Sequence, residues 1–140
     1  MSTSTAHLEL KTVEGTGLRF GVRTGKVAFT LESGADSRYP NPIQAVLCAV
    51  AGCSGMDVIS LLRKKRQRVT RYEIEVTGER REEHPRAFTR IEILHRVRGH
   101  DLSPAAVAEA IRLSDTKYCS VHAMLEPKVK LVSRFEVLPA

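Results

Sequence analysis

A long apolar segment directly after Asn41-Pro42 constrains the fold of this chain most strongly. Asn is a good N-cap and Pro suits the first helical position, and no proline follows over residues 43–67. Residues 43–53 are almost entirely apolar or small, which is typical of a helix with protein on all sides. A helix over 43–67 would be roughly 37 Å long, which exceeds the core of one small domain. We therefore expect a second subunit to cover part of it.

Segments of alternating apolar and polar residues flank this helix and indicate strands. The alternation predicts strands near residues 8–10, 18–22, 27–31, 69–78, 88–97 and 129–137. The cap-and-proline signal recurs at Ser103-Pro104 and opens a helix to Leu113, and a shorter helical turn covers about 119–125. The order β-β-β-α-β-β-α-α-β, with hairpin-like connections, predicts a single α+β domain over residues 1–140 with a mostly antiparallel sheet.

Composition excludes several classes of protein. Hydrophobic residues make up 42% and charged residues 27% of the 140 residues, which excludes a disordered chain. The longest apolar run, Ala45–Ala51, is far shorter than the ~18 residues of a membrane span. Residues 1–7 lack the basic and apolar parts of a secretory signal. We therefore expect a cytoplasmic protein without a membrane partner.

The net charge of +6 comes in good part from a basic run over residues 63–71. This run lies at the end of the predicted long helix, where cations complement the helix dipole. RNA binding through the run is the alternative, but aromatic residues for base stacking are scarce. We therefore do not expect nucleic acid to be a partner.

The three cysteines are the residues most able to carry chemistry, and their odd number fits free thiols in a reducing compartment. Cys53 lies between small residues in the middle of the long helix, where a thiol is either an inert buried side chain or a nucleophile. Cys119 lies at a loop-to-helix junction, where it is either structural or a thiolate stabilised by N–H groups. Cys48 lies about 140° around the helix from Cys53, and we expect it in the core.

Charged residues could tune these thiols. Asp57 follows Cys53 by one helical turn on the same face, where it could raise the pKa of the thiol or hold an arginine beside the sulfur. The candidate cations are Arg19, Arg23 and Arg38. Because Arg19 and Arg23 share the polar face of one predicted strand, the alternative is that both are simply exposed to solvent.

We expect neither a metal nor a cofactor. Cys119 and His122 have only Cys53 as a plausible third ligand, and no zinc-type pair of cysteines occurs. Motifs for nucleotide binding and for serine hydrolysis are also absent from the sequence.

Two cysteine motifs stand out together: Asn41-Pro-Ile-Gln-Ala-Val-Leu-Cys-Ala-Val-Ala-Gly-Cys53 and Leu113-Ser-Asp-Thr-Lys-Tyr-Cys119-Ser-Val. Shorter motifs accompany them: Asp57-Val, Leu62-Arg-Lys-Lys-Arg66, Glu79-Arg and His84-Pro. Together these motifs resemble the OsmC/Ohr family, especially its YhfA-like branch, over nearly the whole chain. The resemblance implies the OsmC-like fold and an intertwined homodimer, with two long central helices and two active sites at the subunit interface.

The resemblance also implies a function in oxidative stress defence, the reduction of organic hydroperoxides to alcohols. In the family, the cysteine on the central helix is the peroxidatic nucleophile and the second cysteine resolves it. Cys53 and Cys119 take those roles by motif position. Cys53 would attack the peroxide and become a sulfenic acid, and Cys119 would condense with it to a disulfide. A cellular dithiol would then reduce this disulfide.

The sequence departs from the family pattern beside the expected site. Family members carry a glutamate after the Asn-Pro motif that orients a catalytic arginine, and Ile43 occupies this position. Arg19 is the nearer match for that arginine and Arg23 the alternative. We hypothesise that Asp57 takes over as the carboxylate that orients it. Loss of the glutamate favours an alternative function on the same fold, a non-catalytic dimeric redox sensor or a small apolar ligand-binding protein.

Overall fold

The order of helices and strands matches the α+β fold that the sequence predicts. The computed structural model describes residues 2–140, and its elements follow as three strands, a long helix, two strands, two helices and a last strand. A π-helical turn between the last two helices lies outside the sequence prediction. The chain divides into two compact units, the first ending at Val46 and the second covering Leu47–Ala140.

The first unit contains a three-stranded antiparallel sheet of order β1-β2-β3. Its strands are β1 (Ala6–Leu10), β2 (Leu18–Thr24) and β3 (Val27–Ser33). Thr24 pairs with Val27, so the hairpin turn between β2 and β3 has only Gly25 and Lys26. Gly25 has a positive φ of 58° there, a conformation that glycine adopts without steric cost.

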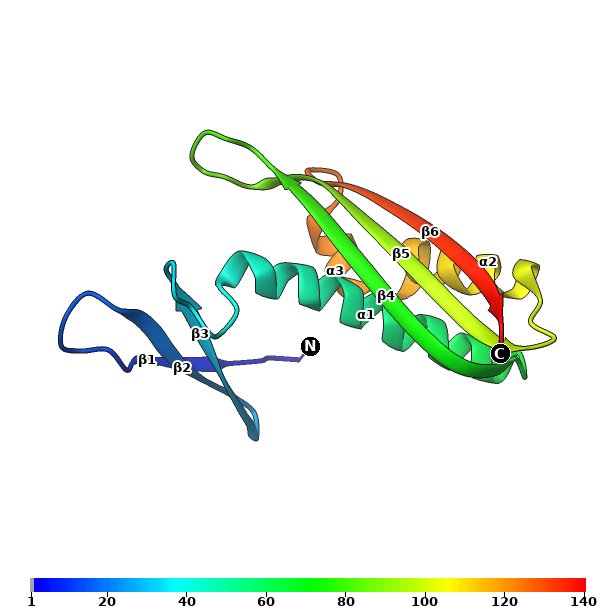
Figure 1. Ribbon diagram of the computed structural model, residues 1–140, viewed down its shortest axis with the longest axis horizontal. Coiled ribbons are helices and arrows are strands. Elements are labelled where there is room, and N and C mark those ends of the chain that lie inside the picture. Colours follow the sequence, from blue (N-terminus) through cyan, green and yellow to red (C-terminus); the bar gives the residue numbers. More distant parts are fainter. Residues whose placement is uncertain (1) are drawn as a thin grey trace. The chain divides into compact units, whose positions relative to one another are not determined.

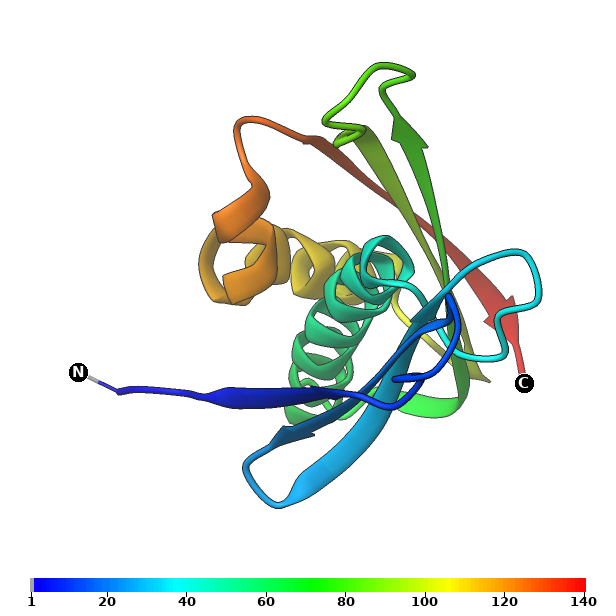
Figure 2. The ribbon, with the colours of Figure 1, turned by 90° about the vertical axis from the view of Figure 1, so that its left-hand side faces the viewer.

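The second unit contains another three-stranded sheet, of order β4-β5-β6 (Figure 1). Its strands are β4 (Arg68–Arg80), β5 (Phe88–His100) and β6 (Lys130–Pro139). The helical elements are α1 (Pro42–Lys64), α2 (Pro104–Leu113), the π-helical turn η1 (Ser114–Tyr118) and α3 (Ser120–Leu125). Figure 2 shows α1, α2 and α3 on one face of this sheet. β4 and β5 are antiparallel, whereas β5 and β6 are parallel because the chain crosses back through the helices between them.

Buried apolar side chains join α1 to α2 and β5. They are Val58, Leu62, Val97, Val107, Ala110 and Ile111. Val58 and Leu62 are four residues apart on α1 and therefore lie on one face of the helix. Gly55 lies near the same face, and it lets α1 approach β4 closely because a Cβ atom there would collide with Ile74. This packing fixes the rotation of α1 about its own axis.

The outward side of α1 differs from the sequence expectation. Cys48 is exposed, so its predicted place in the core is wrong. The physical reason is that the second sheet and α2 cover only one side of the helix, where Val50 and Val58 are fully buried. The helix also ends at Lys64 rather than near Gln67, and Arg66 takes a positive φ of 56° just beyond it.

By length and composition alone, α1 is also apolar enough to cross a membrane, although the count of uninterrupted apolar residues indicates otherwise. A helix in the core of a globular protein passes the same test. The packing of Val58 and Leu62 on α2 and β5 is the behaviour of such a core helix.

His95 on β5 is a fully buried titratable group in the second sheet. It shares a hydrogen bond with Tyr72 on β4, with 2.6 Å between Oη of the tyrosine and Nδ1 of the imidazole. Burial lowers the pKa of His95 to about 4, because the charged imidazolium loses its hydration inside the protein. The imidazole is therefore neutral in the folded chain at pH 7.

Acidification should destabilise the fold through His95. Its folded-state pKa of about 4 lies below the unfolded value near 6.5, so the unfolded chain binds the proton first. The contribution to stability is thus present above pH ~6.5 and is lost as the pH falls toward 4. We expect the free energy of unfolding to fall by about 2 kcal/mol more between pH 7 and pH 5 in the wild type than in His95→Gln. Urea titrations at one protein concentration measure this, and parallel pH dependence of the two proteins would contradict it.

Candidate active site

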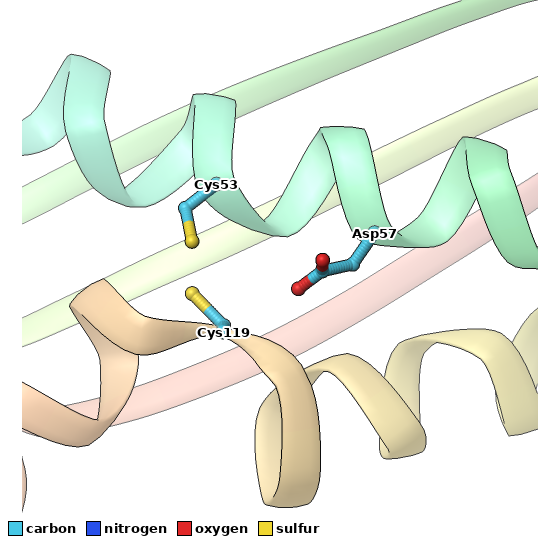
Figure 3. Close-up of side chains that lie close together, drawn as sticks. All are labelled: Cys53, Asp57 and Cys119. Carbon is cyan, nitrogen blue, oxygen red and sulfur yellow. The ribbon is translucent and has the colours of Figure 1, made fainter. Parts of the chain in front are cut away.

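Three reactive side chains meet between α1 and the start of α3: Cys53, Asp57 and Cys119 (Figure 3). The two sulfur atoms and a carboxylate oxygen all lie within 4.8 Å of one another. Figure 3 shows the two sulfur atoms pointing toward each other across the gap between the helices. Cys53 and Asp57 are half-buried, whereas Cys119 is only 4% exposed. The structure therefore brings together three of the four residues that the sequence singles out for chemistry.

The rotation of α1 places two of these groups. Cys53 and Asp57 are four residues apart, so they project from the same face of the helix. Val58 and Leu62 direct the neighbouring face into the core. As a result, Cys53 and Asp57 face the segment that carries Cys119 rather than solvent or the sheet.

Cys119 is the N-cap of α3, which confirms the predicted loop-to-helix junction. Its backbone is extended, with φ −73° and ψ 104°, and its Sγ accepts a hydrogen bond from the His122 N–H at 3.3 Å. This is the usual N-cap arrangement with sulfur in place of oxygen. The cap holds the thiol in one orientation toward α1.

The turn η1 brings a further polar group to the site. The N–H of Cys119 donates to the Ser114 carbonyl oxygen at 2.8 Å, five residues earlier, as in a π-helix. Residues five apart in an α-helix would lie about 140° apart around the axis, whereas this wider turn lets Ser114 and Cys119 both face α1.

Ser114 is fully buried and is the hydrogen-bond partner of Asp57. Its hydroxyl donates to Oδ2 of Asp57 at 3.1 Å, and Ser54 Oγ lies 3.5 Å from the same hydroxyl. Sequence reasoning missed Ser114, since the only signal was its place directly after the predicted helix end. Within the second unit the partner of Asp57 is thus a serine, and an arginine held by Asp57 stays a prediction.

The environment of Cys119 disfavours its ionisation. Burial raises the pKa of its thiol to about 11, and the neighbouring Cys53 and Asp57 act in the same direction. The N–H of His122 opposes this rise by bonding to the sulfur. With a pKa of about 11, roughly one Cys119 in ten thousand is a thiolate at pH 7. The thiol is therefore the predominant form of Cys119 at pH 7.

A second polar cluster holds the segment around Cys119. Nε2 of His122 lies 2.9 Å from Oε1 of Glu126, and its Nδ1 lies 3.6 Å from Oδ1 of Asp115. Burial raises the pKa of Asp115, and its contact with His122 partly opposes that rise. Asp115 precedes Cys119 in the sequence and His122 follows it, so their contact holds together the segment that carries the thiol.

The predicted catalytic arginine lies in the first unit. Arg19 pairs with Glu32, with 2.7 Å between Nε and Oε2, and its guanidinium lies 5.2 Å from the centre of the Tyr39 ring. The alternatives Arg23 and Arg38 are exposed. A role for Arg19 toward the thiols stays a prediction.

A metal ion is the chemical alternative for the trio of Cys53, Asp57 and Cys119. Among residues 2–140, it is the one set of three His, Cys, Asp or Glu donors close enough to share an ion. Structural zinc sites take four protein ligands, one more than this trio offers. We therefore interpret the site as a thiol pair with a carboxylate beside it, and the expectation of no metal stays a prediction.

Mild oxidation should join Cys53 to Cys119 within one chain. The facing sulfur atoms need only close to about 2 Å. Cys48 is exposed and is not part of this group of side chains. Diamide treatment followed by peptide mass spectrometry should recover the Cys53–Cys119 link, and Cys48→Ser should leave its yield unchanged. A main product linked through Cys48 would contradict this geometry.

Comparisons with known proteins identify relatives of this chain. The family model for "OsmC-like protein" matches residues 34–133. Protein YhfA of Escherichia coli strain K12 is 46% identical over 110 residues, which cover 79% of this chain and 82% of YhfA. A hypothetical protein from Aquifex aeolicus VF5 has a crystal structure with a TM-score of 0.89 and 34% identity, covering 100% of this chain and 99% of that one. The organic hydroperoxide resistance protein OhrB of Bacillus subtilis has a TM-score of 0.64 at 15% identity, covering 96% of this chain and 98% of OhrB.

Proposed function

This chain belongs to the OsmC-like family, and from its thiol site we propose that it reduces organic hydroperoxides to alcohols. The matches confirm the family that the sequence motifs resemble, and the likeness to YhfA confirms the branch. The observation that carries the proposal is the pair of facing sulfur atoms of Cys53 and Cys119. Shared fold with a hydroperoxide resistance protein supports the choice of substrate class.

The unequal burial of the two thiols supports the roles that we propose for them. Cys53 is half-buried and can meet a peroxide, whereas Cys119 is buried and shielded from direct oxidation. Cys53 attacks one peroxide oxygen as the O–O bond breaks, and the other oxygen takes up a proton and leaves as the alcohol. The Cys53 sulfenic acid then condenses with the Cys119 thiol, which releases water and forms a disulfide. A dithiol reductant restores both thiols by exchange.

Reaction with a peroxide tests this function directly. Reduced, chelator-treated protein given one equivalent of cumene hydroperoxide should form the Cys53–Cys119 disulfide, faster than with hydrogen peroxide. Cys53→Ser should abolish peroxide consumption, and Cys119→Ser should leave a sulfenic acid on Cys53 that dimedone traps. Cys48→Ser is the matched control and should react as the wild type does. Thiols that oxidise no faster than free cysteine would contradict the proposal.

The same assay separates an enzyme from a redox sensor. The sensor is the function that the absence of the family glutamate at Ile43 favours. With excess dithiothreitol, an enzyme consumes many equivalents of hydroperoxide per chain. Oxidation that stops after one equivalent would assign the protein to sensing instead.

We also propose that the chain is a homodimer that pairs through the outward side of α1. A groove of about 380 Å³ between α1 and β4 is lined by Ala51, Gly52, Gly55, Met56, Ile59, Tyr72 and Ile74. Met56 is 74% exposed in the middle of this apolar lining. A large exposed methionine among small and apolar residues is typical of a subunit contact.

Charge at Met56 should weaken such a dimer. A methionine buried at an interface contributes about 1.5–3 kcal/mol, so Met56→Glu should raise the dimer dissociation constant at least tenfold in sedimentation equilibrium. Met124 on α3 is 75% exposed, and Met124→Glu is the matched control, with the dissociation constant unchanged. A wild-type protein that sediments as a monomer at micromolar concentration would contradict the dimer.

A further inference from the structure

We propose that Asp57 carries the proton in the step that joins the two cysteines, and that Ser114 holds Asp57 in place for this task. The inference rests on the proposed thiol function and adds a catalytic residue and a positioning residue to it. The carboxylate lies within 4.8 Å of both sulfur atoms, and the serine hydroxyl bonds to it at 3.1 Å.

The joining step needs a base because Cys119 is a thiol. Its sulfur is buried, and the pKa of about 11 leaves very little thiolate at pH 7. The step also needs an acid, since hydroxide is a poor leaving group from a sulfenic acid. One group that first accepts and then returns a proton meets both needs.

The groups around the Cys119 sulfur leave Asp57 as the candidate. From α3, His122 offers its backbone N–H to the sulfur, while its ring nitrogens face Asp115 and Glu126. From η1, Asp115 is engaged with His122. From α1, Cys53 is the reaction partner, and Asp57 is the carboxylate beside both sulfur atoms.

The hydrogen bond from Ser114 orients the carboxylate. The serine hydroxyl occupies Oδ2 of Asp57 at 3.1 Å, which leaves lone pairs of the carboxylate for the thiol proton. Ser114 is itself fully buried, so its hydroxyl has few other positions to adopt. Asp57 also lines a small pocket of about 110 Å³ with Ser60, Leu61, Lys64 and Tyr118.

Asp57 accepts and then returns the one proton that moves in this step. The Cys119 S–H bond breaks as its proton moves to the Asp57 carboxylate, and the Cys119 sulfur forms a bond with the Cys53 sulfur. The S–O bond of the Cys53 sulfenic acid breaks, and the departing oxygen takes the proton from Asp57 and leaves as water. The carboxylate is regenerated, and the sulfenic acid is the oxidant that the dithiol pair consumes.

A chromogenic disulfide isolates this step from the peroxide reaction. In a Cys48→Ser background, one equivalent of dithiobis(nitrobenzoate) releases a first thionitrobenzoate when Cys53 forms the mixed disulfide. Attack by Cys119 releases the second. Its rate, measured by rapid mixing, reports the deprotonation and attack of Cys119 alone.

We expect Asp57→Asn to slow the second release about 100-fold at pH 7, as general base catalysis commonly contributes 10²–10⁴-fold. Its rate should rise about tenfold per pH unit, because only hydroxide then generates the thiolate, so the difference from the parent should shrink with rising pH. Ser114→Ala should slow the release less, by up to about tenfold. Asp101→Asn, in the exposed loop after β5, is the matched control and should behave as the parent does.

If Asp57 acted only through its negative charge, Asp57→Asn would have the opposite effect on the rate of the second release. The negative charge of Asp57 raises the pKa of Cys119, so removing only that charge would speed the second release. A second release in folded Asp57→Asn that is as fast as in the parent, or faster, would overturn the proposal. Circular dichroism confirms that the variant is folded. Because the assay uses no peroxide, slow release in Asp57→Asn supports the proton role even if hydroperoxides fail to react, and that failure would overturn only the proposed function.

Discussion

The packing of Val58 and Leu62 against α2 and β5 is the interaction on which the rest of the site depends. This packing fixes the rotation of α1 about its own axis. Because successive residues are about 100° apart around a helix, turning α1 by one residue would move every side chain to a different environment. With this rotation, Cys53 and Asp57 face the α2–α3 segment and Cys48 faces outward. The chemistry of the thiols is therefore set by an apolar contact that contains no reactive atom.

Burial of Cys119 both protects and limits the thiol. Cys119 is only 4% exposed, so its thiol is shielded from small oxidants, yet the same lack of water keeps its proton in place. The N–H of His122 at the cap opposes this effect, and in the proposed proton role the Asp57 carboxylate takes up the proton. Under the proposed function, the Cys119 thiol reacts only after Cys53 has been oxidised beside it, which gives the two half-reactions their order.

Much of the fold could be predicted because its signals are local. The helical period places Cys53 and Asp57 on one face, the Asn-Pro and Ser-Pro signals place two helix starts, and the alternation of residues places the strands. The exposure of Cys48 could not be predicted, because the sequence of an apolar helix does not show which side of the helix the rest of the chain will cover. Ser114 was missed since its bond to Asp57 joins residues far apart in the sequence and depends on a π-helical turn without a sequence signature.

Because of the π-helical turn, the number of residues between Ser114 and Cys119 determines how their side chains face α1. Removing one residue between them would leave the two groups four residues apart, which an ordinary α-helical turn keeps on one face, whereas adding one residue would require a still wider turn. Conservative changes of side chain within the turn leave this spacing untouched. The segment is therefore more sensitive to an added residue than to substitution of its exposed side chains at 116–118, the reverse of what surface loops usually permit.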